Sequence, residues 1–411
     1  MHDPAHIDLA ILAARPKAIA ALLRRFRDLD TAEEAFQEAC LRALQTWPRK
    51  GPPRDPTAWL VMVGRNAAMD AKRRNSSTEP LPADSLLDAR EDLTPERLDE
   101  SHYRDDILRL LFVCGHPTLQ ATQQVALALR IVSGLTVEQI AKAFLVSPAA
   151  MEQRITRAKR AIAEVGVEFD TPGAAERRVR LAAVSTMIYL IFNEGYGSTQ
   201  DTAAARTALA DEAIRLGRLL SSLFPTDPEV LGLLALMLLQ QSRAPARFDA
   251  NGEIVLLDEQ DRSRWNRTLV DEGRLLLERA AVYQAPGPYQ LQAAIVALHA
   301  SAARPEDTSW IQIDSLYQTL ETLQPSPVVT LNRAVAVWKL RGPEAALEMV
   351  DPLNSELDGY FYFHGLRGAL LKDLNRLDDA REALNRAIAL ANSVAEANLI
   401  RRELDRLTTS E

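Results

Sequence analysis

A basic stretch near residue 155 carries the side chains best suited to contact a polyanion. Within LTVEQIAKAFLVSPAAMEQRITRAKRAI, residues 135–162, four cations fall inside seven residues: Arg154, Arg157, Lys159 and Arg160. Guanidinium and ammonium groups neutralise phosphates, and the amide of Gln153 can hydrogen-bond to a base edge. Because the whole chain has a formal net charge of −8, this local basic face indicates DNA binding. The alternative interpretation is a solvated basic helix face.

Two helix starts position these side chains. Thr136 followed by Gln139 forms a capping box, so one helix is expected to start at about Val137. Ser147 followed by Pro148 predicts a second start, with an N-cap and a proline at the first helical position. Two short helices joined by so tight a turn predict a helix-turn-helix. Its expected core is Ile140, Ala141, Phe144, Met151 and Ile155, and its second helix is expected to direct outward Ala149, Gln153, Arg154, Arg157 and Arg160.

A second helical module precedes this one in the chain. Thr31 and Glu34 have the spacing of a capping box and predict a helix, AEEAFQEACLRAL, whose apolar side includes Leu41 and Leu44. The following WPRKGPPRDPTAWL holds four prolines and is predicted to be a loop. The next helix is expected from about residue 58, with Thr57 as its cap. It ends in a basic tip: Lys72, Arg73 and Arg74.

These stretches together resemble one family. DTAEEAFQEACLRALQTW and PTAWLVMVGRNAAMDAKRR are similar to region 2 of bacterial RNA polymerase sigma factors of the extracytoplasmic-function group, within the sigma-70 family, and residues 118–162 resemble region 4. DDILRLLFVCGHPTL and the chain after residue 175 resemble the subgroup with a C-terminal tetratricopeptide (TPR) domain. The resemblance covers nearly the whole chain. It implies a non-enzymatic transcription initiation factor that directs core polymerase to promoters with −10 and −35 elements and helps to open the DNA.

The resemblance also implies roles for individual residues. The clamp helices of the largest polymerase subunit are expected to contact Glu34, Gln37, Glu38 and Arg42. The −10 element is expected to contact Arg49, Lys50, Arg54, Trp59, Arg65, Asn66, Met69, Lys72 and Arg73. The −35 element is expected to contact Ser147, Ala149, Gln153, Arg154, Arg157 and Arg160, and the polymerase flap is a further expected partner. The chain departs from the family at Leu145, where glycine is frequent, and at Glu152, where a basic residue is frequent.

Charge is unevenly distributed and follows the expected domains. Residues 1–75, the expected region 2, hold 13 basic and 9 acidic side chains, and residues 118–165 hold 6 and 3. Residues 76–105 are acidic, contain three prolines and are predicted to be a linker, either a plain tether or a segment that threads polymerase channels. Region 4 is expected at 106–165 and the TPR domain at 175–411. Residues 166–411, which include the expected TPR domain, hold 25 basic and 34 acidic side chains.

The C-terminal half repeats with a period of 34 residues. Ala334, Val337, Ala346 and Val350 recur as Gly368, Leu371, Ala380 and Leu384, in the pattern of a packed helical pair. Stacked pairs predict an α-solenoid, and Asn251-Gly252 in RFDANGEIVLL predicts a small β-hairpin inserted into it. Three interpretations are open for this hairpin and for the segments YLIFNEGYGSTQ and DEQDRSRW. They bind a protein partner, they clamp the domain against the sigma regions, or they only join helices.

The sequence therefore predicts an all-α protein with no catalytic, cofactor or metal site. Cys114 and His116 are too few for zinc, which takes four ligands, and the phosphate-loop, dinucleotide and nucleophile-elbow motifs do not occur in the sequence. With two cysteines, no apolar run of membrane length and no basic segment before the first apolar run, a cytoplasmic protein is expected. The main hypothesis is a sigma factor regulated at its TPR domain by a protein partner. The rival is a helix-turn-helix and TPR regulator that binds operators independently of core polymerase.

Overall fold

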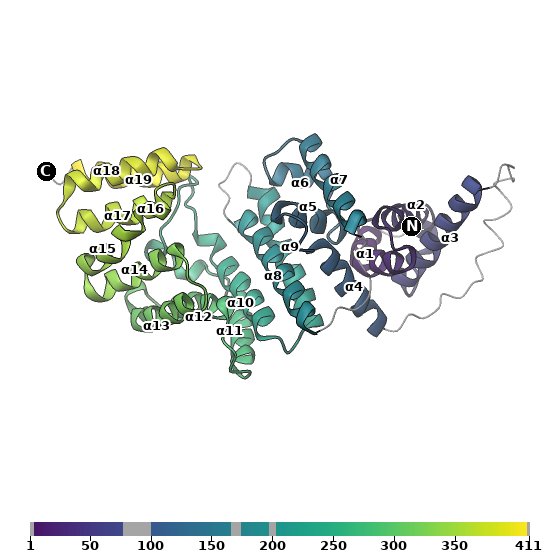
Figure 1. The fold of residues 1–411 in the computed structure, drawn as a ribbon, viewed down its shortest axis with the longest axis horizontal. Helices are drawn as coiled ribbons and strands as arrows, with labels where there is room; N and C mark the ends of the chain where they lie inside the picture. The colour runs from purple at the N-terminus through teal and green to yellow at the C-terminus, as the bar shows by residue number, and fades with distance from the viewer. Residues whose placement is uncertain (1–3, 77–99, 166–173, 197–202, 409–411) are drawn as a thin grey trace. The chain divides into compact units, whose positions relative to one another are not determined.

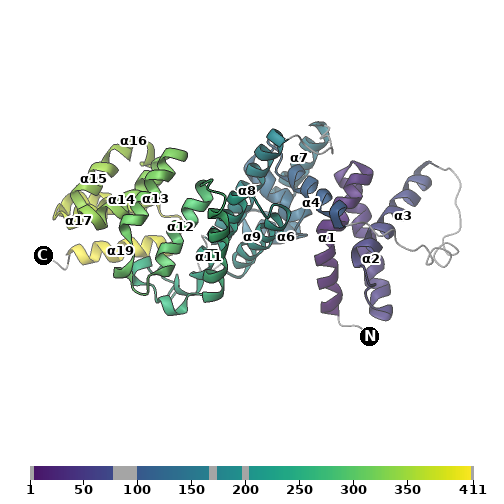
Figure 2. The ribbon, with the colours of Figure 1, turned by 90° about the horizontal axis from the view of Figure 1, so that it is seen from below.

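The computed structural model describes residues 4–76, 100–165, 174–196 and 203–408, and the chain divides by its contacts into two compact units, Met1–Ile191 and Phe192–Glu411. Both units are helical, as the sequence predicted, and Figures 1 and 2 show their helices. The boundary falls inside helix α8 (Ala174–Tyr196), whereas the sequence placed the start of the C-terminal domain at residue 175. None of the described helices is long and apolar enough to cross a membrane.

The first three helices pack against one another in a bundle: α1 (Pro4–Phe26), α2 (Leu29–Lys50) and α3 (Pro56–Ser76). Figure 2 shows them side by side at the purple end of the chain. Leu22, Phe36 and Leu60 are almost completely buried in its core. α3 approaches α2 closely at Gly64, where an added Cβ would lie 2.7 Å from the carbonyl oxygen of Ala35. This close packing fixes the two helices that carry the expected region 2 contacts.

The predicted helix starts in this bundle were wrong by three residues for α2 and by two for α3. α2 begins before Thr31, because the Asp28 carboxylate accepts hydrogen bonds from the Thr31 amide at 2.8 Å and from its hydroxyl at 2.5 Å. α3 begins before Ala58, because Asp55 Oδ1 accepts from the Ala58 amide at 3.0 Å, where Thr57 was the predicted cap. In both cases an aspartate just upstream satisfies the first amides of the helix.

The proline-rich loop is shorter than predicted. α2 continues through Pro48 and ends where Gly51 takes a φ of 79° and its amide donates to the Trp47 carbonyl at 2.8 Å. A positive φ is accessible to glycine without a steric cost, so Gly51 is the residue that stops the helix. The loop therefore comprises only residues 51–55.

A second bundle of the first unit contains α4 (Glu100–Cys114), α5 (Ala121–Ile131), α6 (Val137–Ala143) and α7 (Pro148–Val165). α5 packs against both α6 and α7. α4 starts at residue 100, so the last six residues of the predicted linker are helical, and residues 77–99 of that linker lie outside the described residues. The first part of α8 reaches the end of α4, where a Cβ on Gly115 would lie 2.9 Å from the Val184 side chain.

In the second unit, helices that follow one another in the chain pack against each other, as expected for an α-solenoid. They are α9 (Ala203–Leu223), α10 (Pro228–Ser242), α11 (Arg267–Ala281), α12 (Pro288–Ser301), α13 (Trp310–Leu323), α14 (Pro327–Arg341), α15 (Pro343–Val350), α16 (Asn354–Leu357), α17 (Phe361–Asp373), α18 (Leu377–Leu390) and α19 (Val394–Thr408). Figure 1 shows the last of these in green to yellow.

The residues of the 34-residue repeat lie at the contacts between these helices. All eight are buried, in α14, α15, α17 and α18. At Gly368 an added Cβ would lie 2.7 Å from the Leu384 side chain, so a larger residue would displace this part of α18. The predicted hairpin is a tight turn with one antiparallel bridge, between Phe248 and Ile254, and Gly252 adopts a φ of 80° within it.

Candidate nucleic-acid interface

The outer face of α2 carries the residues expected to contact polymerase: Glu34, Gln37, Glu38 and Arg42. The first two are exposed, and the last two form an ion pair with 3.0 Å between Arg42 Nε and Glu38 Oε1. Leu41 and Leu44 lie on the same face and are 57% and 49% exposed. The sequence grouped both leucines with the broad apolar side of the helix, and the structure leaves this part of that side exposed. The exposed face of α2 therefore combines polar and apolar contact area.

The residues expected at the −10 element follow the end of α2, the loop and α3. Arg49, Lys50 and Arg54 are exposed, at the end of α2 and in the loop. Trp59 is half-buried because its ring packs edge-on against Trp47, with 5.3 Å between the ring centroids.

Farther along α3, Arg65 and Asn66 are half-buried and Met69 is 40% exposed. The side chains of Lys72 and Arg73 lie outside the described residues. Thus α3 presents a mixed basic, amide and thioether surface beside the loop.

The helix-turn-helix forms as the sequence predicted. Thr136 Oγ1 accepts from the Gln139 amide at 3.2 Å, and Gln139 Oε1 accepts from the Thr136 amide at 2.8 Å, which completes the capping box. Ser147 Oγ accepts from the Ala150 amide at 3.2 Å at the start of α7. Leu145 in the turn has a φ of 52°, so the turn keeps the left-handed geometry that glycine favours, at a strain of roughly 1 kcal/mol.

One side of α7 is buried and the other is open to solvent. Met151 and Ile155 are buried, together with Ala158 and Ile162. The open side carries the residues expected at the −35 element: Ser147, Ala149, Gln153, Arg157 and Arg160 are exposed, and Arg154 is half-buried. Arg160 Nε lies 2.8 Å from Glu164 Oε1 in an exposed pair within the helix. This side can therefore present an amide and several guanidinium groups to a groove of DNA.

Lys159, the fourth cation of the basic stretch, contacts α2 in this structure. Its Nζ lies 2.6 Å from Asp30 Oδ1 and 2.8 Å from Glu33 Oε2. Burial alone would lower the pKa of Lys159, but hydrogen bonds to the two carboxylates raise it above its ordinary value. The sequence had grouped Lys159 with the phosphate-binding cations, whereas here carboxylates of the neighbouring bundle hold it.

Glu33 is the centre of the contact between the two bundles. It is 4% exposed, and besides Lys159 its carboxylate lies 3.1 Å from Arg130 Nε on α5 and 3.9 Å from Arg15 Nη2 on α1. Arg15 also donates to the backbone carbonyls of Arg130 and Ile131, each at 3.1 Å. Burial lowers the pKa of Arg15, and the charge of Glu33 opposes this. A buried carboxylate shared by three cations is costly to leave unpaired, so the bundles are coupled through it.

The segment DEQDRSRW joins helices of the second unit. Arg262 is buried, and its Nη1 donates to the backbone carbonyls of His299 at 2.9 Å and Ala302 at 2.6 Å. Asp258 Oδ2 lies 3.0 Å from Lys339 Nζ on α14. These contacts favour the interpretation that this segment joins helices.

The hairpin segment connects distant parts of the second unit. Glu253 Oε1 accepts from Asn398 Nδ2 at 2.8 Å, 145 residues later in the chain, and Arg402 Nη2 donates to the Ile254 carbonyl at 3.2 Å. Residues 197–202 of YLIFNEGYGSTQ lie outside the described residues. In the part of the chain that the structure describes, no group of three or more His, Cys, Asp and Glu side chains is placed to hold a metal ion.

Three family models match parts of the chain. Sigma-70 region 2 matches residues 11–78, Sigma-70 region 4 matches residues 110–162, and a family of unknown function, DUF6596, matches residues 180–281. The first two ranges contain the α1–α3 bundle and the helix-turn-helix, respectively.

A relative and a solved structure were each matched over most of the chain. An uncharacterized protein, R00370, of Rhizobium meliloti (strain 1021) is 62% identical over 410 residues, which is 99% of this chain and 97% of that protein. The crystal structure of the yeast Tom70 matches with a TM-score of 0.39 and 12% identity, covering 98% of this chain and 85% of that one. Region 2 and region 4 of the sigma-70 family occur together and in this order, which supports a sigma factor for promoter-specific transcription initiation.

Proposed function

We propose that this chain is a sigma factor of the extracytoplasmic-function group that docks on core RNA polymerase in the cytoplasm through the outer face of α2. The observation that carries the proposal is the exposure of Leu41 and Leu44 beside Gln37 and Arg42. Exposed apolar side chains flanked by polar ones are typical of a protein interface, and arginine is enriched at such sites. The clamp helices of the largest polymerase subunit are the proposed partner.

Promoter DNA is proposed to contact α3 at the −10 element and α7 at the −35 element. Pro148, Ala149 and Ala150 are small and exposed at the start of α7, so this end can enter a major groove. Gln153 can pair with a base edge, and Arg157 can hold a phosphate or a guanine. The Arg160 pair is exposed, so a phosphate can replace its carboxylate partner at little cost.

Promoter binding requires the two bundles of the first unit to separate. The −10 and −35 elements lie about 25 base pairs apart, or roughly 85 Å along B-form DNA. The longest helices of this unit have 23 residues and span about 35 Å, and α7 contacts α2 directly. We infer that the contact at Glu33 belongs to a closed form of the free protein and that docking of polymerase on α2 favours an open form.

The acidic C-terminal domain is proposed to regulate this activity, with a protein partner. Its charge motivates the hypothesis that it covers basic surface of region 2 or region 4 until polymerase binds. A chain ending at residue 202 tests this and retains α8, whose Val184 and Ile188 are buried. Higher DNA affinity of the free truncated protein would support inhibition. Unchanged affinity with abolished transcription would instead identify the domain as a required contact.

Run-off transcription tests the main proposal. Core polymerase is combined with the wild-type chain or with Gln37→Ala plus Arg42→Ala, on the DNA upstream of the protein's own gene. Initiation that depends on the chain and is lost in the variant supports a sigma factor docking through α2. DNA binding without polymerase-dependent initiation, unaffected by the two substitutions, would support the operator-binding regulator instead.

A further inference from the structure

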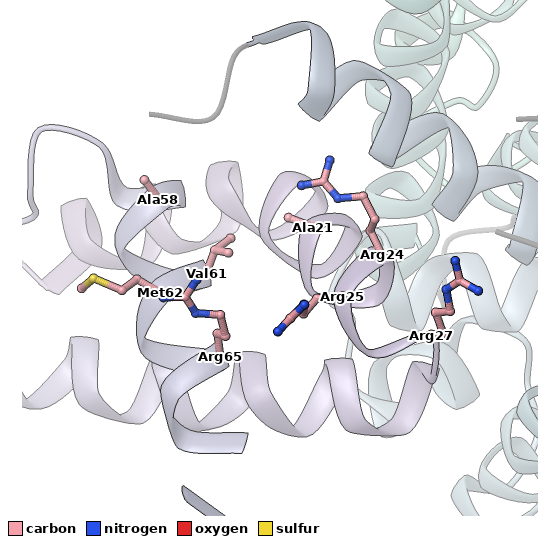
Figure 3. A pocket seen from close by; sticks show the side chains of 8 residues that line it. All are labelled: Ala21, Arg24, Arg25, Arg27, Ala58, Val61, Met62 and Arg65. Carbon is pink, nitrogen blue, oxygen red and sulfur yellow. The ribbon is translucent and has the colours of Figure 1, made fainter. Parts of the chain in front are cut away.

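The second unit has a basic site that lies apart from the surfaces proposed for DNA. In the first unit, a cavity of about 630 Å³ between α1 and α3 is lined by arginines, and Figure 3 shows Arg25 and Arg65 extending from these helices toward the space between them. That cavity belongs to the surface proposed for the −10 element. The basic site of the second unit lies around the indole ring of Trp265, the last residue of DEQDRSRW.

Backbone contacts bring two separate segments together at this ring. The Asn266 amide donates to the Ser242 carbonyl at 2.9 Å, which places the end of α10 beside the end of DEQDRSRW. The Cζ atom of Arg243 lies 5.8 Å from the centroid of the Trp265 ring, and that of Arg262 lies 5.5 Å from it. Two guanidinium groups therefore lie against one indole ring, whose faces attract cations.

Each of these three side chains has a hydrogen-bond donor without an acceptor in the described part of the chain. The unpartnered atoms are Arg243 Nε, Arg262 Nε and Trp265 Nε1, and all three are shielded from solvent. The residues Arg262 and Trp265 are only 6% and 2% exposed. A buried N–H group without an acceptor is unfavourable, so a cluster of such groups indicates a water or a ligand that accepts from them.

The two guanidinium groups also lack carboxylate partners. Arg243 and Arg262 form no ion pair with any residue that the structure describes. The acidic side chains whose charges act on Arg262 from farther away already pair with other cations: Asp258, Glu306 and Asp307. Like charges held close together repel one another, and an anion between them relieves this repulsion.

His299 responds to this uncompensated charge. It is 7% exposed, and its Nδ1 has no hydrogen-bond partner in the described residues. Burial lowers the pKa of His299 to about 4, helped by the charges of Arg243 and Arg262. The imidazole is therefore neutral at pH 7, and a neutral imidazole can direct one ring N–H toward an acceptor.

The chemistry of these groups indicates what the site would bind. Three N–H donors beside two positive charges are complementary to an anion with several acceptor oxygens. A phosphate group carries a charge of about −1.5 to −2 at pH 7, which matches two guanidinium groups, whereas a single carboxylate would neutralise only one of them. Phosphate oxygens also accept the parallel hydrogen bonds that a guanidinium group donates.

We propose that the second unit binds a phosphate group beside Trp265, with Arg243 and Arg262 as the charged contacts and the indole N–H as a further donor. Arg243 is half-buried, so the phosphate reaches the site from its side. The phosphate is either the free inorganic ion or part of a small phosphomonoester. The proposal does not depend on the sigma-factor function, because all of its residues lie within the second unit.

Isothermal titration calorimetry of the full-length chain tests the proposal, with sodium phosphate, glycerol 3-phosphate and sodium acetate titrated at pH 7.5 and matched ionic strength. Arg243→Gln removes a charge whose side chain makes no hydrogen bond in the described chain. Trp265→Phe keeps an aromatic ring but removes the indole N–H. Arg264→Gln is the matched control, because it removes an exposed arginine from the same segment.

Phosphate is expected to saturate the wild type and to bind Arg243→Gln at least about ten-fold more weakly, because charge-assisted hydrogen bonds are the strong ones. Trp265→Phe should weaken binding about three-fold or more, and Arg264→Gln should match the wild type. Phosphate should also raise the urea midpoint of the wild type and of Arg264→Gln, because a ligand that binds only the folded chain stabilises it. Tighter binding of glycerol 3-phosphate than of phosphate would assign the site to an ester, and the reverse order to the free ion.

Three results would overturn the proposal. One is the absence of saturable binding of both phosphate compounds to the wild type, which would leave the donors to buried water. Another is equal phosphate affinity in the wild type, Arg243→Gln and Trp265→Phe. The third is acetate binding as tight as phosphate binding, which would make the ligand a carboxylate.

Far-UV circular dichroism shows whether each variant is folded. If Arg243→Gln does not fold, the affinity of Trp265→Phe decides the proposal. The calorimetry uses the chain without polymerase, so a negative result there leaves the sigma-factor proposal standing, and run-off transcription tests that proposal separately.

Discussion

Lys159 Nζ lies 2.8 Å from Glu33 Oε2, and this contact joins the helix expected to read the −35 element to the helix expected to dock on polymerase. Both groups are largely withdrawn from solvent, with side-chain exposures of 19% and 5%. When an ion pair is shielded from water, removal of one partner leaves the other charge buried and unpaired, and this is costly. The same contact therefore stabilises the closed form and opposes its opening on a promoter.

Lys159→Met should loosen the closed form. The substitution keeps most of the aliphatic stem but removes the charge, and it should weaken the contact by about 1–3 kcal/mol. Small-angle X-ray scattering of the free chain should then show a larger radius of gyration. Arg160→Met is the matched control, because Arg160 pairs with Glu164 on its own helix. An unchanged radius in Lys159→Met would mean that this ion pair does not hold the bundles together.

Leu41→Glu should abolish docking on polymerase without unfolding the chain. Leu41 is 57% exposed, so its replacement should change the free energy of unfolding by no more than about 0.5 kcal/mol. A buried charge in the interface should weaken polymerase binding by about 2 kcal/mol or more. Binding of labelled core polymerase measures this. Leu12→Glu, at a 53% exposed leucine of α1, should bind like the wild type. Equal losses in both variants would argue against α2 as the docking site.

Gln153→Ala and Arg157→Ala should affect promoter binding differently. Loss of an amide that pairs with a base should cost about 1–3 kcal/mol on the preferred −35 sequence and relax the preference at one position. Loss of a phosphate contact should weaken all sequences alike and reduce the salt slope by about 0.9. Binding of the reconstituted holoenzyme to a panel of −35 substitutions separates the two. Lys142→Ala, on the exposed side of α6, serves as a control. The assignment fails if Gln153→Ala leaves the sequence preference unchanged.

Acid should destabilise the second unit through His299. Burial lowers the pKa of His299 to about 4, helped by the charges of Arg243 and Arg262. The unfolded chain takes up this proton near pH 6.5 and the folded chain does not, so stability is full above pH 6.5 and is lost as pH falls toward 4. At pH 5 the loss should be about 2 kcal/mol.

Urea unfolding at pH 7.5 and pH 5, followed by tryptophan fluorescence, measures this loss. The ring centroid of His299 lies 5.3 Å from that of Trp310, one of the five tryptophans that contribute to the signal. His299→Phe should remove most of the difference between the two pH values, whereas His6→Phe, at an exposed histidine, should not. If the free energy of unfolding of the wild type were the same at both pH values, the lowered pKa of His299 would be contradicted.

Local chemistry explains which helix boundaries could be predicted. The capping box at Thr136 and the Ser147 cap formed as expected, because each depends on side chains within three residues. The start of α2 was wrong because Asp28 and Thr31 are both good caps, and the sequence alone does not rank two caps three residues apart. Pro48 lies inside the last turn of α2, and the helix ends at Gly51, whose positive φ the proline-rich pattern did not reveal.

By itself, the sequence determined the helical class, the order of region 2, region 4 and a repeat domain, and the local capping of the reading helix. The helical class, the repeat and the capping follow from periodicity and short-range hydrogen bonds, and the order of the two regions follows from their resemblance to a known family. The tertiary structure decided that Leu41 is exposed, that Lys159 meets Glu33 rather than solvent, and that Arg25 and Arg65 line one cavity. Such pairings join residues 40 to 126 positions apart, and they depend on how the helices pack, which no local pattern encodes.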